Sequence, residues 1–250
     1  MSLFSKLFQK KEDALVELFQ FTLVGTDMHS HLLPGIDDGA VDLENSIELI
    51  SHLHEMGYQK LITTPHIFWD MYPNTSQIIR EKEAIVKSEL ERRGIHIGFQ
   101  AAAEYYVDAH FESLIEQEDL LTFGDNRILF ELSFDDEQVN YRRAVFNLQV
   151  AGYKPILAHP ERYEYWHNNF SKYEDVVDRG VSLQVNTNCL TGHYGPHVRN
   201  IAERLVEADL VDFIGTDCHH LGHIGLLNQM RQSPILKKLI ESGRLLNHTL

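Results

Sequence analysis

Two histidines two positions apart open the part of the chain where residues able to do chemistry are concentrated. His29 and His31 follow an apolar run, and their spacing places both imidazoles on one side of an extended backbone. Asp37, Asp38 and Gly39 come soon afterwards. Imidazole and carboxylate together suit Zn, Mn or Fe(II), whereas Ca prefers oxygen ligands alone. In a chain with 15 histidines this stretch is weak evidence by itself.

Residues of the same kinds recur at the ends of later apolar runs, namely His66, Glu104, Glu131, His159, Asp217 and His219. In an α/β barrel the carboxyl ends of the parallel strands meet at one face, so these side chains are expected to converge on one cup. Unpaired buried carboxylates cost several kcal/mol each, so cations are their natural partners there. The pattern therefore predicts clustered metal ions.

The elements that must position these residues alternate regularly. Strands are expected at about 22–28, 60–64, 95–103, 128–130, 155–158, 181–185 and 211–215, and helices at about 42–57, 75–93, 108–117, 137–151, 173–179, 196–208 and 235–242. Asp42 is a candidate N-cap, and Gly57 and Gly94 are candidate helix ends. About seven strands alternating with helices predict a parallel sheet with crossover helices.

The chain has 250 residues, 43% of them hydrophobic and 24% charged, which is enough for one large α/β domain. We expect that domain at residues 22–250, after an N-terminal extension at 1–21 that is helical by the spacing of Phe4, Leu7 and Phe8. The extension packs either on the domain or on a second subunit, which leaves the oligomeric state open.

Composition also restricts partners and location. A formal net charge of -15 argues against a nucleic-acid binder, which would carry a basic stripe. The sequence lacks a signal peptide and any apolar stretch near the roughly 18 residues of a membrane span. The two cysteines form no CxxC pair, so a cytoplasmic, reducing location is expected.

Several competing chemistries lack their motifs. A cysteine-dependent phosphatase needs an Arg six residues after its Cys, but Gly195 follows Cys189 and Ile224 follows Cys218 at that spacing. The chain has no phosphate-binding Gly-Lys-Ser/Thr loop and no Gly-x-Ser-x-Gly elbow. Clustered metal ions bridged by a carboxylate act as a Lewis acid and generate hydroxide near neutral pH. The residues thus predict a metal-dependent hydrolase, best suited to phosphate esters.

At these residues the chain resembles the polymerase-and-histidinol-phosphatase (PHP) superfamily, and within it the bacterial metal-dependent tyrosine phosphatases linked to capsule and exopolysaccharide synthesis. The matching motifs run in the family's order and are Asp27-Met28-His29-Ser30-His31, Asp37-Asp38-Gly39, Thr64-Pro65-His66, Ala103-Glu104-Tyr105-Tyr106, Phe130-Glu131-Leu132, Ala158-His159-Pro160-Glu161-Arg162-Tyr163, Gln184-Val185-Asn186 and Thr216-Asp217-Cys218-His219.

The resemblance implies a distorted TIM-like barrel of seven β/α units with three divalent metal ions at the carboxyl ends of the strands. Manganese or iron is expected, with Zn, Co or Mg as alternatives. Position by position, the first ion would be held by His29, His31, Glu104 and Asp217, the second by Glu104 as a bridge with Glu131 and His159, and the third by Asp38, His66 and His219. Asp37 competes with Asp38 for its role, and Asp38 matches the family's ligand.

Arg162 matches an arginine with which the family grips phosphate. The alternative is a surface salt bridge to Glu161 or Glu164. The family's second arginine, after Asp-x-His, is missing here; either His223 replaces it or phosphate binding is weaker. We expect a substituting imidazole to assist below about pH 6.5, where it becomes cationic.

The function predicted from sequence and resemblance is removal of phosphate from tyrosine on a protein partner. That partner is expected to be a bacterial tyrosine kinase that regulates capsule or exopolysaccharide synthesis. Two alternatives are a small-molecule phosphatase, such as one acting on histidinol phosphate, and a non-catalytic regulatory binding module. The full set of ligands argues against the last.

Overall fold

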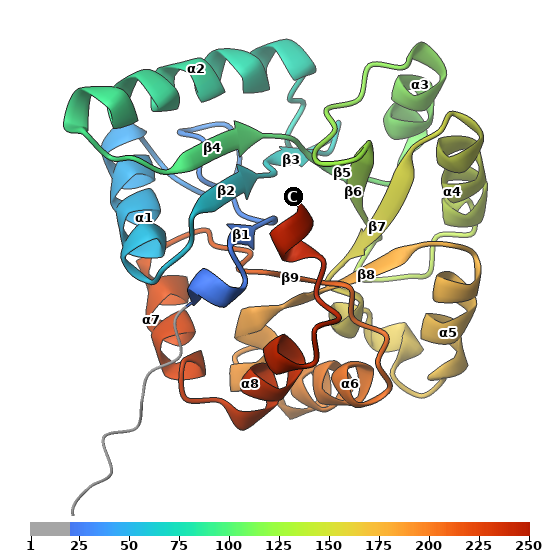
Figure 1. Ribbon diagram of the computed structural model, residues 1–250. Helices are drawn as coiled ribbons and strands as arrows, with labels where there is room; N and C mark the ends of the chain where they lie inside the picture. Colours follow the sequence, from blue (N-terminus) through green and yellow to red (C-terminus); the bar gives the residue numbers. More distant parts are fainter. Residues whose placement is uncertain (1–20) are drawn as a thin grey trace, which may run out of the picture.

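The computed structural model describes residues 21–250, which form an α/β fold with two parallel sheets (Figure 1). The predicted helix of the N-terminal extension lies outside the described residues, and the division at residue 21 stays a prediction. One sheet has the order β1-β2-β4 and the other β3-β5-β6-β7-β8-β9, with every pair parallel. This confirms the predicted α/β class with crossover helices.

The strands are β1 (Thr26–Asp27), β2 (Lys60–Thr63), β3 (His66–Ile67), β4 (Gly98–Ala101), β5 (Glu104–Tyr106), β6 (Arg127–Glu131), β7 (Lys154–Ala158), β8 (Ser182–Asn186) and β9 (Phe213–Gly215). The α-helices are α1 (Leu43–Glu55), α2 (Ser76–Arg93), α3 (Ala109–Gln117), α4 (Tyr141–Val150), α5 (Ser171–Asp178), α6 (Pro196–Glu207), α7 (Leu221–Met230) and α8 (Pro234–Glu241). The helices surround the strands in Figure 1. None of the helices within residues 21–250 is long and apolar enough to span a bilayer.

Local sequence signals explain the helix ends. The carboxylate of Asp42 accepts a hydrogen bond from the backbone N–H of Asn45, as an N-cap does. Gly94 ends α2 with φ +69°, a left-handed conformation that glycine adopts at little cost. Pro196 occupies the first turn of α6, where its missing N–H would have no helical partner. These predicted boundaries are confirmed.

The longer strands β6 and β7 are mostly apolar because both of their faces are buried. In β6, Ile128 and Phe130 belong to the large hydrophobic cluster beneath the helices, whereas the intervening Leu129 belongs to a second, smaller cluster. This alternation follows from the two-residue period of a strand. Buried parallel strands therefore read as continuous apolar runs in the sequence.

Hydrogen bonds join the two sheets at both edges. On one side, the backbone of Ser30 forms a parallel bridge with Cys218, and the N–H of Asp217 donates to the carbonyl of His29 (2.8 Å). On the other side, β2 continues into β3 and β4 into β5 after short breaks, and the N–H of Glu104 donates to the carbonyl of Pro65 (3.1 Å).

The C-terminal residues lie over the strands in Figure 1. Asn247 is fully buried and its amide donates to the carbonyls of Thr26 (2.9 Å) and Ile214 (2.8 Å). Its side-chain oxygen accepts from the N–H of Ile214 (3.1 Å). Leu246 and Leu250 pack against the smaller hydrophobic cluster. Asn247 thus ties the end of the chain to β1 and β9.

Three expected elements differ in detail. The strand predicted at 22–28 is a 3-10 helix at Phe21–Leu23 followed by a two-residue strand, because positive φ at Gly25 turns the chain between them. The helix predicted from 137 begins only at Tyr141. α7 was not predicted, because its polar start and its glycines at 222 and 225 give only a weak helical signal.

Candidate metal centre

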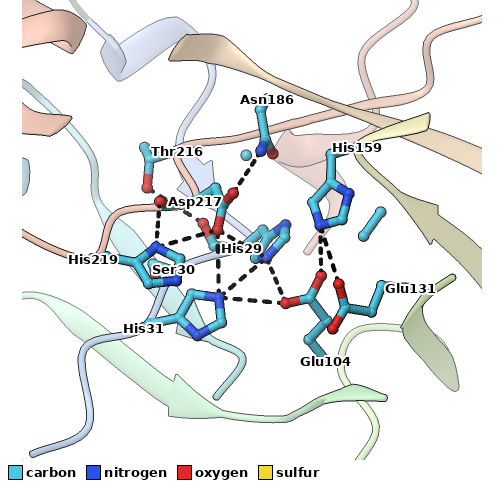
Figure 2. A network of polar contacts seen from close by, with 12 residues as sticks. His29, Ser30, His31, Glu104, Glu131, His159, Asn186, Thr216, Asp217 and His219 are labelled. Atoms are coloured by element: carbon cyan, nitrogen blue, oxygen red, sulfur yellow. Dashed lines mark hydrogen bonds and ion pairs between the residues drawn. The ribbon is translucent and has the colours of Figure 1, made fainter. Parts of the chain in front are cut away.

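Four buried residues form the deepest part of the site, which we call the floor: His29, His31, Glu104 and Asp217 (Figure 2). Both histidines follow β1, Glu104 begins β5, and Asp217 follows β9. Oε2 of Glu104 lies 3.2 Å from Nε2 of His29 and 3.4 Å from Nε2 of His31. Oδ1 of Asp217 lies 3.4 Å from the same two nitrogens. Two imidazoles and two carboxylates therefore point at one another.

The second oxygen of Glu104 faces a different imidazole. Oε1 of Glu104 lies 2.9 Å from Nε2 of His159, which is also 3.8 Å from Oε2 of Glu131 (Figure 2). His159 follows β7 and Glu131 ends β6. Glu104 consequently has one oxygen in each of two neighbouring donor groups, as a bridging carboxylate requires.

Three less buried residues, together with Arg162 described below, form what we call the rim: Asp38, His66 and His219. Oδ1 of Asp38 lies 3.5 Å from Nε2 of His66 and 3.4 Å from Nε2 of His219. The other ring nitrogen of His66 lies 3.3 Å from Glu104 and 3.2 Å from Glu131. The Asp38 side chain is 51% exposed, in contrast to the fully buried floor.

A glycine allows the loop that carries Asp38 to approach the floor. A Cβ atom on Gly39 would lie 2.1 Å from the carbonyl oxygen of His31, closer than any real contact permits. The N–H of Ala40 donates to that carbonyl (3.0 Å). Gly39 is therefore needed for close backbone contact.

All nine predicted ligands take part in groups whose donor atoms lie within 4.8 Å of one another. The groups are His31, Asp38, His66 and His219; His29, His31 and Glu104; His29, His159 and Asp217; and His66, Glu104 and Glu131. The groups overlap through His29, His31, His66 and Glu104, so the assignment of each residue to one ion stays a prediction.

Neighbouring polar residues orient these ligands. Oδ2 of Asp37 lies 2.8 Å from Nδ1 of His31, and Oε1 of Gln184 lies 2.8 Å from Nδ1 of His29. The Nδ1–H form of each ring leaves its Nε2 lone pair aimed into the site. Asn186 donates to Oδ2 of Asp217 (2.6 Å). Such partners fix ring orientation and tautomer at metal sites, and Asp37 has this supporting place rather than a place in the donor groups.

The charges of the floor demand compensation. Burial works to raise the pKa of Glu104, but His29 and His66 bring it well below its usual range. Burial likewise works to lower the pKa of His66, yet Glu131 and Glu104 raise it to about 9. Oε2 of Glu104, although surrounded by imidazoles, is a buried oxygen without a hydrogen-bond partner among residues 21–250. Protons on the imidazoles would supply positive charge here, and divalent cations suit the same donors.

Two of the ligand positions carry unusual backbone. His159 has φ +33° and Asp217 has φ +48°, both in the left-handed region that residues with side chains rarely adopt. His159 directly follows β7 and Asp217 is the second residue after β9, so the turn at each strand end aims the side chain into the site. Backbone strain of this kind is concentrated at functional sites.

Arg162 completes the rim from the 3-10 helix Pro160–Arg162, which starts right after His159. Its Nη1 lies 3.4 Å from Oδ2 of Asp217. Glu161, one alternative partner, is buried and accepts the backbone N–H of Asn186 (2.8 Å). The ion pair of Arg162 is therefore made within the site; its role toward phosphate stays a prediction.

His223 lies in the first turn of α7 and lines the same cavity. Its Nδ1 is 2.9 Å from the carbonyl of Asp217. Burial lowers the pKa of His223 to about 4. The imidazole is thus neutral at pH 5.5 and above, which contradicts the expectation of a cation below pH 6.5. Its replacement of the family's second arginine stays a prediction.

The cavity above the ligands has a volume of about 260 Å³. Besides the predicted residues, Phe134, Tyr194 and His220 line it. Sequence reasoning missed both aromatic residues; the available signal was an aromatic side chain in a loop soon after a strand end. Tyr105 and Tyr163 instead pack in the core, where their hydroxyls accept backbone N–H groups of Leu121 (2.6 Å) and Leu132 (3.0 Å).

This chain is similar to known proteins in both sequence and structure. The tyrosine-protein phosphatase YwqE of Bacillus subtilis (strain 168) is 31% identical over 196 residues, which cover 78% of this chain and 77% of YwqE. The tyrosine-protein phosphatase CpsB of Streptococcus agalactiae serotype V is 26% identical over 201 residues, covering 78% of this chain and 83% of CpsB.

A solved structure also matches. It comes from crystal structures of YwqE from B. subtilis and CpsB from Streptococcus pneumoniae, described as unique metal-dependent tyrosine phosphatases. The match has a TM-score of 0.76 and 29% identity and covers 90% of this chain and 94% of the other. The family model described as capsular polysaccharide synthesis, CpsB/CapC, matches residues 25–233. The predicted resemblance is therefore confirmed: this chain belongs to the CpsB/CapC family.

Proposed function

We propose that this protein is a metal-dependent phosphatase that hydrolyses phosphotyrosine on a protein partner. The observation that carries the proposal is the convergence of five imidazoles and four carboxylates in the donor groups of one cavity, with a guanidinium at its edge. The relatives' names and the matching crystal structures support tyrosine phosphate as the substrate.

We propose three ions, with manganese or iron as the native metal. His29, His31, Glu104 and Asp217 would hold the first, Glu104 with Glu131 and His159 the second, and Asp38, His66 and His219 the third. The separate oxygens of Glu104 support the bridge. Bound divalent ions would supply Lewis acidity and a hydroxide nucleophile near neutral pH.

The protein's own residues then bind and orient the substrate. The Arg162 guanidinium, with its planar donors, would bind two oxygens of the phosphoryl group and stabilise the charge that grows there during displacement. Its pKa stays above the ordinary value, because Asp217 and Tyr194 outweigh the opposing effect of burial. Arg162 is therefore charged throughout the working pH range.

We further propose that the two sheets form one distorted seven-stranded barrel, and that residues 22–250 are its single domain. The support is the Ser30–Cys218 bridge at one edge and the continuation of β2 into β3 and β4 into β5 at the other. Such a barrel would bring the proposed ligands together at the strand ends, as in other barrels.

The experiment that tests the function combines metal analysis with turnover. Purified protein is analysed for bound metal and assayed on a phosphotyrosine peptide and on histidinol phosphate, before and after chelation. We expect bound metal and turnover of the peptide to disappear together and to return with Mn, Fe or Co. Full activity in metal-free protein would contradict the proposal, and preferred turnover of histidinol phosphate would identify a small-molecule phosphatase instead.

For the physiological partner we propose a bacterial tyrosine kinase that regulates capsule or exopolysaccharide synthesis. The support is the family description, capsular polysaccharide synthesis. The test is dephosphorylation of the autophosphorylated kinase from the same cell, compared with unrelated phosphotyrosine proteins. Equal rates on all of them would contradict a dedicated kinase partner.

A further inference from the structure

Two aromatic rings lie against the guanidinium of Arg162. Its central carbon lies 4.3 Å from the ring centroid of Phe134 and 4.6 Å from that of Tyr194. Phe134 belongs to the loop between β6 and α4, and Tyr194 to the segment just before α6. The two rings come from different parts of the chain and both contact this arginine. Both distances are within the range of attractive cation–π contacts.

The guanidinium needs such support because the Arg162 side chain lines two cavities. The first is the cavity over the metal ligands. The second is a cavity of about 320 Å³ lined by Phe134, Arg162, Glu164, Tyr194 and Val198. An arginine side chain has many rotamers, and the second cavity offers the guanidinium space away from the site together with a carboxylate nearby.

Only one ion pair is formed between Arg162 and the site in the described part of the chain, and it is long, 3.4 Å from Nη1 to Asp217. That single contact leaves most of the five N–H donors of the guanidinium free for an incoming anion. It also means that hydrogen bonds do little to fix the orientation of the guanidinium plane. Ring faces stacked on the guanidinium would determine that plane without occupying its donors.

We infer that Phe134 and Tyr194 are positioning residues that hold the Arg162 guanidinium over the metal cup, in the orientation that binds the phosphoryl group. This inference rests on the proposed role of Arg162 in phosphate recognition. Phe134 also contacts the ring of His159 (centroids 5.5 Å apart), so it links the arginine to a proposed metal ligand.

The experiment is a double-mutant cycle on metal-loaded protein. Phe134→Leu, Tyr194→Leu, Tyr194→Phe and Arg162→Ala are made alone, and each leucine change is also combined with Arg162→Ala. Every variant is assayed for kcat and KM on p-nitrophenyl phosphate, for binding of inorganic phosphate by calorimetry, and for metal content. Phe146→Leu, an exposed phenylalanine on α4, is the matched control.

Each leucine change should lower kcat/KM and phosphate affinity about 5- to 30-fold, since leucine fills the space without a π face. Tyr194→Phe should stay within about 2-fold, because it keeps the ring. In the Arg162→Ala background the leucine changes should cost less than about 2-fold, since a residue acting through Arg162 has nothing left to position. Metal content and the Phe146→Leu control should equal the parent.

Two results would overturn the inference. One is that the leucine changes lower kcat/KM and phosphate affinity as much in the Arg162→Ala background as in the parent; the other is that Tyr194→Phe lowers them as much as Tyr194→Leu. Failure of the proposed function has a different result. In that case the parent protein turns over no phosphate ester, while calorimetry still shows whether the rings control phosphate binding through Arg162.

Discussion

The floor and the rim of the metal centre are built in different ways. The four floor residues are at most 2% exposed. In the rim, by contrast, the Asp38 side chain is 51% exposed and the Arg162 side chain is 24% exposed. Backbone hydrogen bonds between neighbouring strand ends hold the floor, as in the bond from Asp217 N–H to His29 carbonyl (2.8 Å). In the rim, His66 begins β3, whereas Asp38 and His219 lie in loops and Arg162 ends a 3-10 helix.

This difference indicates a division of labour. A buried floor excludes water and strengthens electrostatic interactions, which suits tight retention of ions. An accessible rim can exchange water for substrate oxygens. We therefore expect changes in the floor to act mainly on metal content, and changes in the rim to act mainly on turnover.

The largest effect is expected from Glu104→Gln. This change removes the negative charge between two donor groups while keeping the shape of the side chain. Loss of one partner from a buried charge cluster costs about 3–5 kcal/mol, so we expect at least one ion to be lost and kcat to fall more than about 100-fold. Metal stoichiometry by mass spectrometry and kinetics on a phosphotyrosine peptide measure both effects.

The matched change in the rim is Asp38→Asn, which also exchanges a carboxylate for an amide. We expect it to retain the ions of the floor and to lose less activity than Glu104→Gln. If Glu104→Gln kept all its metal while Asp38→Asn lost it, both the bridge and the contrast between floor and rim would be wrong.

The next effect in size is expected from Arg162→Lys. Lysine keeps the positive charge but has neither the planar fork nor the face that stacks on Phe134 and Tyr194. We expect kcat/KM to fall about 10- to 1000-fold with metal content unchanged, since removal of one transition-state donor costs about 100- to 1000-fold and lysine keeps the charge. An unaltered kcat/KM would show that Arg162 serves only as an ion-pair partner of Asp217.

The floor was also the part that the sequence predicted best. His29, Glu104 and Asp217 stand at the ends of apolar runs, and parallel strands must end on one face, so their convergence followed from the pattern. The position of Asp37 did not follow, because its choice between ligand and support depends on a 2.8 Å contact to His31 that spacing alone cannot specify.

The aromatic contacts of the rim could not be predicted for a related reason. Phe134 and Tyr194 are 60 residues apart, in segments without regular hydrophobic period, and only the packing of the loops brings both to Arg162. The charge of His223 was predicted wrongly, since an isolated sequence carries no measure of burial. Periodicity thus predicts strand ends, while loops and environments need the three-dimensional structure.

A smaller effect is expected from His223→Ala. Burial lowers the pKa of His223 to about 4, so its imidazole is neutral across the range from pH 5.5 to 8.5. We expect a loss in kcat/KM of less than about 10-fold whose size does not change over that range, measured on one peptide beside the parent enzyme. If the loss in kcat/KM instead grew as the pH fell toward 5.5, His223 would act as a cation after all.

The same lowered pKa has a consequence for stability. The unfolded chain binds a proton on His223 near pH 6.5, whereas the folded chain binds it only near pH 4. The contribution of neutral His223 to stability is therefore present above pH 6.5 and is lost as pH falls from 6.5 to 4. His223→Ala should flatten the fall in Tm over that window. An identical pH dependence of Tm in parent and variant would contradict the buried, neutral state.

The smallest effect on turnover is expected from the change of both cysteines to serine, although both are buried. Burial raises the pKa of the Cys189 and Cys218 thiols, which disfavours the thiolate that a nucleophile requires. We expect the kcat/KM of the fully metal-loaded double variant to stay within about 2-fold of the parent value. Placing a hydroxyl in each buried position costs about 1–3 kcal/mol, so Tm should fall by several degrees. A folded, fully metallated double variant without activity would instead assign a cysteine to the reaction.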